Sequence, residues 1–340
     1  MAFAVFRADA SPAVGGGHVM RCLALAEALT ARGWICAFAC NTGAARTIPA
    51  LAASRHEVWE LTNNDAATPA ALQRRWPAGA ELLTVDHYGL DAAYESACRP
   101  WAARILVIDD LASRDHDADL LLDQAPGRSD ADYRGRVPPP CRLMLGTDYA
   151  LLRPQFAGAR ADALRKRRER KVLRRVLVSL GATDPDNVTG QVLDVIHGRE
   201  VNLGVDVILG AGTPHREAIA RQLQVLPPPS ALHVDPTVET MIRLMAAADL
   251  AIGAGGISAW ERCCLGLPAL ILLLADNQRA NVLALARAGA ASATKVNELP
   301  DRIRELTANP AALGDMSTAA ASLCDGGGCE RVARVLDITE

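Results

Sequence analysis

The sequence has no excess of either charge. Its 340 residues include 36 Lys and Arg against 39 Asp and Glu, which gives a formal net charge of −3. A chain that holds nucleic acid through its overall electrostatic field needs a marked basic excess, so this function class is disfavoured. Half of the residues are hydrophobic and 22% are charged, a balance typical of soluble globular proteins that excludes a disordered or collagen-like chain.

Long apolar runs are also lacking. The two longest, at 246–260 and 265–275, are interrupted by Gly, Pro or Asp and fall short of the roughly 20 residues that span a bilayer. We therefore expect no membrane span. The first residues form a short β-branched and aromatic segment with Arg7 and Asp9, without the basic and long apolar regions of a signal peptide. This pattern predicts a cytoplasmic protein.

The nine cysteines include no CxxC pair. They are scattered at positions 22, 36, 40, 98, 141, 263, 264, 324 and 329. An odd number at irregular spacing favours reduced, mostly buried thiols over a disulfide framework or a zinc site.

The hydrophobic pattern predicts an α/β protein of two domains. A length of 340 residues corresponds to roughly two domains at about 150 residues each. Short β-branched runs alternate with Ala- and Leu-rich segments at helical spacing, which indicates βαβ units and parallel sheets. Strands are expected at 2–7, 34–40, 57–61, 81–86, 104–109 and 120–123, and in the second half at 176–180, 205–209, 231–234, 250–252 and 269–273. The clearest helices are expected at 19–31 and 91–102.

A basic run at 165–171 lies between the two halves. Such a run can bind nucleic acid or a membrane, but a solvated face near a linker is the commoner explanation and the one favoured here. The predicted organisation is an N-terminal domain at 1–160, a basic linker region at 161–175 and a C-terminal domain at 176–340.

A glycine-rich loop follows the first predicted strand. Gly15, Gly16 and Gly17 precede His18 at the start of the first helix, and a loop of this kind at a helix N-terminus is suited to an anion. The third glycine of the dinucleotide fingerprint is replaced by Met20, so that motif is excluded. His18 is expected at the carboxyl edge of the sheet, where the helix N-terminus favours a neutral imidazole that can accept a proton. A histidine that only caps or packs the loop is the equally weighted alternative.

Two further clusters of polar residues lie in the first half. The run from Asp86 through His87 and Tyr88 to Gly89 follows the fourth strand, where its side chains can either bind a sugar or only pack. Downstream lies an acidic cluster made of Asp109, Asp110, Asp115, His116, Asp117 and Asp119. Its spacing fits neither a calcium loop nor a zinc motif, so we favour hydrogen-bonding and capping roles over a metal site.

The second half carries two more glycine loops. One runs from Gly181 to Asp184 and the other from Gly253 to Ser258, and each lies between a predicted strand and a predicted helix. Both can hold a phosphate group or can be ordinary tight connections. Glu261, one turn into the second of these helices, can accept two hydrogen bonds from a ribose diol. Three such loops at corresponding strand ends favour a nucleotide-sugar site.

At these residues the chain resembles the UDP-2,4-diacetamido-2,4,6-trideoxy-β-L-altropyranose hydrolase family of pseudaminic acid biosynthesis, which is related to the two-domain glycosyltransferases of the peptidoglycan GlcNAc-transferase type. The matching segments run through nearly the whole chain in order and comprise 7–21, 86–89, 109–112 with Arg114, His116 and Asp119, then 146–156, 181–184, 255–261 and 276–278. Two positions depart from the family pattern: Ala182 replaces a usual glycine, and Asp123 replaces a commoner amide.

The resemblance implies two Rossmann-like domains that face one another across a cleft, an arrangement called GT-B-like. UDP would bind mainly to the C-terminal domain and the sugar would reach toward the N-terminal one. The implied catalytic residues are His18, as the base that deprotonates water, with Tyr88 and Asn277 placing the water or the sugar. The implied substrate-binding residues are Arg7, Asp9, Gly17, Arg21, Asp86, His87 and Gln278. The implied UDP-binding residues are Gly181, Ala182, Thr183, Asp184, Gly255, Gly256, Ile257, Ser258 and Glu261.

The function implied by the resemblance is inverting hydrolysis of a UDP-sugar at the anomeric carbon to give UDP and free sugar. Loop N–H groups and helix dipoles can stabilise the leaving group, so neither a metal nor another cofactor is expected. The expected partners are the UDP-sugar and water, without nucleic acid, and the oligomeric state is left open. Two alternatives remain: a glycosyltransferase with the same fold, and a non-catalytic protein that binds nucleotide-sugars.

Overall fold

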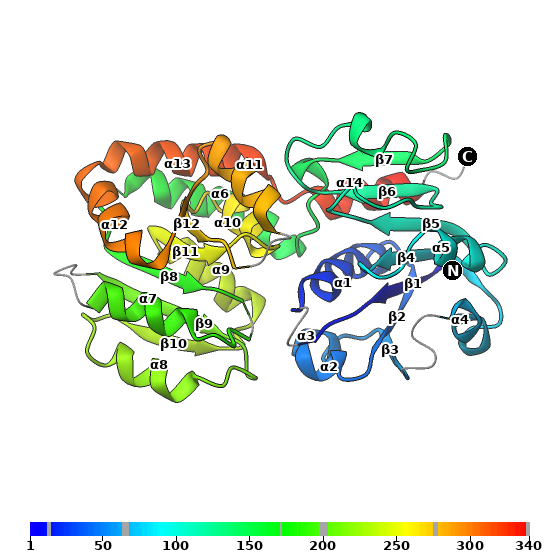
Figure 1. The fold of residues 1–340 in the computed structure, drawn as a ribbon, viewed down its shortest axis with the longest axis horizontal. Coiled ribbons are helices and arrows are strands. Elements are labelled where there is room, and N and C mark those ends of the chain that lie inside the picture. Colours follow the sequence, from blue (N-terminus) through cyan, green and yellow to red (C-terminus); the bar gives the residue numbers. More distant parts are fainter. Residues whose placement is uncertain are drawn as a thin grey trace. The chain divides into compact units, whose positions relative to one another are not determined.

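The computed structural model describes residues 1–11, 15–62, 68–170, 172–181, 183–197, 203–274 and 278–337. The chain divides into two compact units (Figure 1). The first unit comprises residues 1–153 and 327–340, and the second comprises residues 154–326. Each unit is an α/β domain built around one parallel sheet, which confirms the expected fold class of the two halves.

The first unit has a seven-stranded sheet in the order β3-β2-β1-β4-β5-β6-β7. Its strands are β1 (Phe3–Ala8), β2 (Ile35–Asn41), β3 (Glu57–Leu61), β4 (Ala80–Asp86), β5 (Ala102–Ile108), β6 (Leu120–Asp123) and β7 (Arg142–Leu145). Its helices are α1 (Gly17–Thr30), α2 (Ala44–Thr47), α3 (Pro49–Ala52), α4 (Pro69–Arg75), α5 (Ala92–Cys98) and α14 (Gly328–Asp337), with 3-10 turns η1 (Asp130–Tyr133) and η2 (Thr147–Tyr149).

Both faces of this sheet are buried because its strands are apolar on both sides. Phe6 belongs to a core cluster that also contains residues of α1 and α14, whereas its neighbour Val5 belongs to a second cluster with Tyr94 of α5. Successive side chains of a strand point to opposite faces, and strands buried on both faces read as continuous apolar runs. The unit therefore has helices packed on both faces of the sheet.

The second unit has a six-stranded parallel sheet in the order β10-β9-β8-β11-β12-β13. Its strands are β8 (Arg175–Ser179), β9 (Gly204–Leu209), β10 (Ala231–Val234), β11 (Leu250–Ala254), β12 (Ala269–Leu272) and β13 (Ala291–Thr294). Its helices are α6 (Pro154–Glu169), α7 (Val188–His197), α8 (Arg216–Leu223), α9 (Val238–Ala247), α10 (Ser258–Cys264), α11 (Arg279–Arg287), α12 (Leu299–Ala308) and α13 (Pro310–Leu323), with the 3-10 turn η4 (Val296–Glu298).

The sequence pattern missed one strand in each unit. β7 and β13 lie at the edges of their sheets and have four residues each, with sequences RLML and ASAT. Edge strands bury less apolar surface than central ones, so their hydrophobic pattern is weak. The predicted helix at 91–102 is also shorter than expected: Asp91 caps α5, which ends at Cys98, and residues 102–108 form β5.

The unit boundaries differ from the expected ones at both ends of the second unit. The expected linker at 161–175 includes the second half of α6, and the last helix, α14, packs on α1 in the first unit. α14 returns to the first unit because Val332 and Leu336 on its apolar face complete the cluster around Phe6. The basic run alone could not predict that α14 packs on the core of the first unit.

The basic run itself has a structural role. Arg167 is buried, and its guanidinium donates to the carbonyl oxygens of Met245, Ala248 and Leu265 at 2.6–2.8 Å. Arg170 donates to the carbonyls of Ala246 and Ala247, and together these arginines satisfy the C-terminal end of α9. On the exposed face of α6, Asp162 pairs with Arg165 and Lys166. Lys171 lies outside the described residues.

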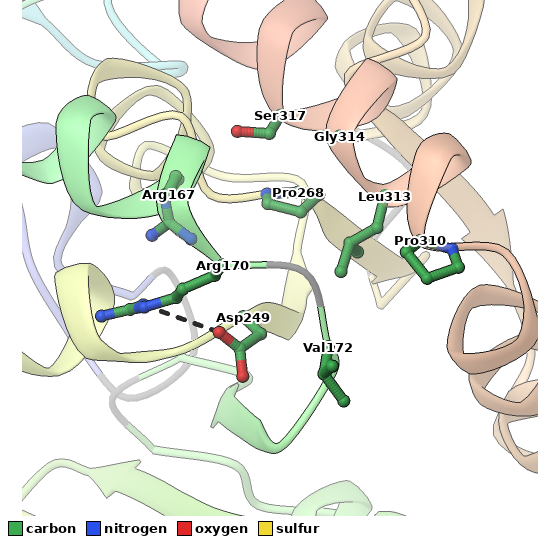
Figure 2. A pocket seen from close by; sticks show the side chains of 9 residues that line it. All are labelled: Arg167, Arg170, Val172, Asp249, Pro268, Pro310, Leu313, Gly314 and Ser317. Atoms are coloured by element: carbon green, nitrogen blue, oxygen red, sulfur yellow. Dashed lines mark ion pairs between the residues drawn. The ribbon is translucent and has the colours of Figure 1, made fainter.

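A small pocket lies beside these two arginines in the second unit (Figure 2). Arg170 reaches Asp249 across one side of the pocket at 3.6 Å, and Pro268, Leu313 and Ser317 contribute to its wall. Because the guanidinium groups are already bonded to carbonyl oxygens, the pocket belongs to the packing of α6 against α9 and α13.

All nine cysteines are free thiols and eight of them are buried, as the sequence predicted. Among the described residues, every helix is too short or too polar to cross a lipid bilayer.

Candidate functional site

The strand order of the first unit brings the first glycine loop beside the Asp86 segment. β1 and β4 are neighbours in the sheet, and Ala8 is paired in register with Asp86 at their carboxyl ends. The chain leaves β1 toward one edge of the sheet and β4 toward the other, so this is the topological switch point at which parallel α/β sheets bind ligands. The expected position of His18 at this edge follows from α1, which begins one residue earlier.

His18 and Asp86 form a buried pair. The ring nitrogen Nδ1 of His18 lies 2.5 Å from Oδ1 of Asp86, and no described residue hydrogen bonds the other ring nitrogen, Nε2. Arg21, one turn along α1, donates from Nε and Nη2 to the two oxygens of Asp86, each at 2.6 Å. Burial by itself would raise the pKa of Asp86, but Arg21 and His18 outweigh it and hold the pKa well below its ordinary value. Asp86 is therefore an ionised acceptor that orients His18.

Tyr88 extends this pair toward the next strand. Its ring packs edge-on against the imidazole of His18, with 4.7 Å between ring centroids, and its hydroxyl donates to Oδ1 of Asp110 at 3.0 Å. The other oxygen of Asp110 accepts from Arg21, also at 3.0 Å. Asp110 was expected to have a hydrogen-bonding or capping role, so the sequence did not assign it to this site. The sequence feature that could have assigned Asp110 to the site is its position directly after the fifth predicted strand.

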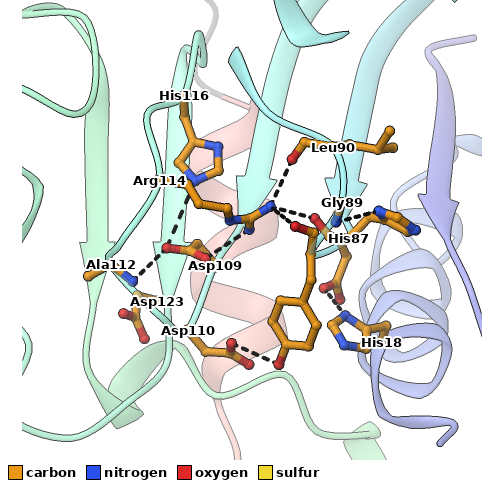
Figure 3. A network of polar contacts seen from close by, with 12 residues as sticks. His18, His87, Gly89, Leu90, Asp109, Asp110, Ala112, Arg114, His116 and Asp123 are labelled. Atoms are coloured by element: carbon orange, nitrogen blue, oxygen red, sulfur yellow. Dashed lines mark hydrogen bonds and ion pairs between the residues drawn. The ribbon is translucent and has the colours of Figure 1, made fainter. Parts of the chain in front are cut away.

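Arg114 holds the segment that carries Tyr88 (Figure 3). Its Nη1 donates to the carbonyl oxygens of His87, Tyr88 and Leu90 at 2.8 Å each, and its Nη2 donates to Oδ1 of Asp109 at 3.0 Å. One guanidinium thus ties the chain after β4 to the chain after β5.

The rest of the acidic cluster supports Asp109 and its neighbours. Oδ2 of Asp109 accepts from the backbone N–H of Ala112 at 2.8 Å and lies 3.1 Å from the hydroxyl of Tyr133. His116 is buried with Nδ1 2.8 Å from Oε1 of Glu95. Asp115, Asp117 and Asp119 pair with arginines, and no group of three or more possible metal ligands occurs among the described residues. The side chains of this cluster thus form hydrogen bonds and ion pairs, which agrees with the predicted hydrogen-bonding role.

Tyr133 lies between two carboxyl groups and has only one proton to donate. Its hydroxyl is 2.7 Å from Oδ2 of Asp123 and 3.1 Å from Oδ2 of Asp109. Burial raises the pKa of Asp123, although the neighbouring Arg128 acts in the opposite direction. Asp123 accepts in all of its contacts: Oδ1 accepts the N–H of Ala125, and Oδ2 accepts from Arg128 and from the hydroxyl of Tyr133.

Arg7 and Asp9 form an ion pair at the carboxyl end of β1. Arg7 is buried and pairs with Asp9, which also accepts from the backbone N–H of Asn41 at 2.8 Å. His87 places Nε2 3.1 Å from Asp9. Arg7 is thus enclosed at the carboxyl end of β1, where it holds Asp9.

The second unit has a topological switch point of the same kind, between β8 and β11. β8 and β11 are neighbours, so the loop after Ser179 and the loop after Ala254 lie at the same edge of the sheet. Gly181 has a φ of +114°, a conformation that favours glycine. Asp184, however, accepts the N–H groups of Val188 and Thr189 at 2.9 Å each. A carboxylate thus occupies the N-terminus of α7, where the sequence left open either a phosphate or an ordinary tight connection. Thr183 lies in the same loop.

The loop after β11 presents several donors. The backbone N–H of Gly255 donates to Oε1 of Gln278 at 3.0 Å, so Gln278 braces the loop. No described residue accepts the N–H groups of Gly256, Ile257 or Ser258. Glu261 lies half-buried on α10. Two of the expected site residues, Asn277 and Ala182, lie outside the described residues.

Known proteins resemble this chain in sequence. No protein-family model matches the chain. It is 33% identical over 206 residues to the spore coat polysaccharide biosynthesis protein SpsG of Bacillus subtilis, covering 57% of this chain and 58% of that protein. It is 29% identical over 194 residues to the UDP-2,4-diacetamido-2,4,6-trideoxy-β-L-altropyranose hydrolase of Campylobacter jejuni, covering 55% of this chain and 63% of that protein. Both matches span less than two thirds of the relative.

The likeness in fold to solved structures covers nearly the whole chain. The crystal structure of MurG from Acinetobacter baumannii superposes with a TM-score of 0.68 at 15% identity, covering 99% of both chains. At this identity the likeness concerns the fold alone. The two parallel-sheet α/β domains of this chain have the fold of the GT-B glycosyltransferases.

Proposed function

We propose that this protein is an inverting hydrolase of a UDP-sugar, with UDP-2,4-diacetamido-2,4,6-trideoxy-β-L-altropyranose as its substrate. The observation that carries the proposal is the oriented pair of His18 and Asp86. The sequence relationship to the Campylobacter hydrolase and the GT-B fold support the substrate class.

In this proposal His18 is the general base. Asp86 accepts the Nδ1 proton, which leaves the Nε2 lone pair to take a proton from water. Arg21 keeps Asp86 ionised and fixes its orientation through two hydrogen bonds. The water attacks the anomeric carbon, the bond to the UDP oxygen breaks, and the electron pair leaves with the diphosphate. Attack on the face opposite the leaving group inverts the anomeric configuration.

Tyr88 is assigned a positioning role toward the sugar or the water. Its proton is directed to Asp110, so toward a ligand the phenol oxygen acts as a hydrogen-bond acceptor. Nucleotide binding is assigned to the second unit, where the N–H groups of Gly256, Ile257 and Ser258 can stabilise a diphosphate and Glu261 can accept from the ribose. Asn277 keeps its proposed role in placing water or sugar.

The experiment is a proton NMR time course with this UDP-sugar and no acceptor. We expect release of UDP with the α-anomer of the free sugar appearing first. The variant His18→Asn should lower kcat by about 10²- to 10⁴-fold, the usual contribution of a general base, while UDP affinity is retained. UDP-N-acetylglucosamine is the substrate control and should turn over far more slowly.

A glycosyltransferase is the second candidate, favoured by the structural likeness to MurG. It predicts turnover only when an acceptor hydroxyl is added. Acceptor-dependent release of UDP would therefore overturn the hydrolase assignment, and activity unaffected by His18→Asn would overturn the assigned base.

A further inference from the structure

A buried arginine lies directly under the glycine loop of the second unit. Arg262, on α10, is 2% exposed. Its Nη2 donates to the carbonyl oxygen of Ala254 at 2.6 Å, and its Nη1 donates to the hydroxyl of Ser258 at 3.2 Å. These two contacts join the end of β11 to the start of α10, so the guanidinium spans the loop from below.

The backbone at Gly253, near the end of β11, lies close to Arg262. A Cβ atom there would lie 2.6 Å from Nη1 and 2.9 Å from Cζ of Arg262. The glycine thus lets the backbone rest on the guanidinium.

Arg262 forms no ion pair with a described carboxylate, and both of its hydrogen-bond acceptors are neutral. The charge of its chain neighbour Glu261 acts on the guanidinium without such a contact. Burial lowers the pKa of this guanidinium, yet arginine stays protonated in proteins. A buried charge without an ion-pair partner is costly, and buried charges are normally paired. An anion bound on the loop would supply the missing partner.

We propose that Arg262 provides the positive charge of a diphosphate site from beneath the loop at 253–258, while the N–H groups above it make the direct contacts. This inference rests on the proposed function and names a positioning residue for its leaving group. Arg262 acts through the loop, because it holds Ala254 and Ser258 in place and its field favours negative charge at the surface of the loop.

The test compares the affinities of uridine, UMP and UDP by calorimetry. For Arg262→Met we expect UDP affinity to fall roughly tenfold or more, UMP affinity to fall less and uridine affinity to stay unchanged, because the lost interaction scales with ligand charge. Arg262→Lys keeps the charge without the planar fork and should recover part of the UDP affinity.

Arg167→Met is the matched control. Arg167 is also buried and bonded only to neutral oxygens, but it binds the carbonyl of Ala248, which precedes β11, whereas Arg262 binds that of Ala254 at the other end of the strand. This variant should lose thermal stability without any change in the ratio of UDP to uridine affinity.

The outcomes separate the two proposals. A loss for Arg262→Met that is equal for all three ligands, or no loss at all, overturns the role of Arg262 while UDP binding by the wild type stands. If the wild type binds UDP no more tightly than uridine, the second unit holds no diphosphate and both proposals fail. Should Arg262→Met not fold, Arg262→Gln takes its place: a fall in the ratio of UDP to uridine affinity supports the role of the charge, and an unchanged ratio overturns it.

Discussion

At the scale of single residues, the chemistry of the first unit depends on how buried charges are paired. Asp86 is held ionised by Arg21 and His18, and Asp109 by His116 and Arg114, although burial alone would raise the pKa of either carboxyl. The sequence placed His18, Asp86 and Tyr88 at strand ends. It could not show that Asp110 joins Tyr88 to Arg21, because that contact depends on the order of β1, β4 and β5 in the sheet.

His116 predicts a measurable pH dependence of stability. Burial alone would lower its pKa, but Asp109 and Glu95 outweigh burial and raise the pKa from 6.5 to about 9. A raised pKa in the folded state means that the stabilisation is complete below pH 6.5 and is lost as the pH rises to 9. The loss should reach about 3 kcal/mol in the free energy of unfolding.

Urea titrations of the wild type and His116→Gln between pH 6 and pH 9.5 measure this loss. The difference in unfolding free energy between the two proteins should shrink across that window. An NMR titration of the imidazole gives the folded-state pKa directly, and a midpoint near 6.5 would contradict the predicted stabilisation.

At the scale of elements, the side chain of Arg114 joins the segment after β4 to the segment after β5. The chain after β4 carries Tyr88, and the chain after β5 carries Asp110 and Arg114. Such a connection is invisible in hydrophobic periodicity, because Arg114 bonds to backbone carbonyls and these have no sequence signal. The same holds for Arg167. Its run of basic neighbours suggested a linker, but its guanidinium donates to carbonyl oxygens at the C-terminal end of α9.

Substitution of Arg114 should therefore impair turnover without weakening nucleotide binding. Arg114→Lys retains a charge but cannot reach three carbonyls and Asp109 at once, so Tyr88 should lose its position over His18. We expect kcat to fall by about 100-fold, the cost of a displacement on the order of 1 Å at a reacting centre. Steady-state kinetics and UDP calorimetry measure the two effects.

Arg136→Ala is the control for this variant. Among the described residues the side chain of Arg136 pairs only with the exposed carboxylate of Asp115, at 3.5 Å, and its removal should leave kcat unchanged. Equal losses of kcat and UDP affinity in Arg114→Lys would contradict a local role for Arg114.

At the scale of the whole molecule, the sequence predicted two α/β domains and most of their strands, because central parallel strands are strongly apolar. It did not predict that α14 belongs to the first unit. The apolar face of α14 is visible as a pattern, but the pattern does not state which core it completes. Residues of α14 and of β1 that share this core are more than 300 positions apart in the chain.

Leu336→Ala should destabilise the first unit selectively. Leu336 is 1% exposed in the cluster around Phe6, and loss of a buried leucine side chain costs about 2–5 kcal/mol. Hydrogen exchange should show faster exchange for amides of β1 and α1 and unchanged exchange for those of β8 and β11. Arg334→Ala, on the exposed side of α14, serves as the control, and equal acceleration in both units would argue against this division.

The return of α14 also has a consequence for synthesis of the protein on the ribosome. Residues 154–326 are contiguous, so the second unit has all of its elements before α14 is translated. Most of the first unit is translated before the second, yet its core stays open until Gly328–Asp337 has emerged. The part made first thus reaches its final packing last, and its unfilled apolar face is the surface that a nascent-chain chaperone would have to protect.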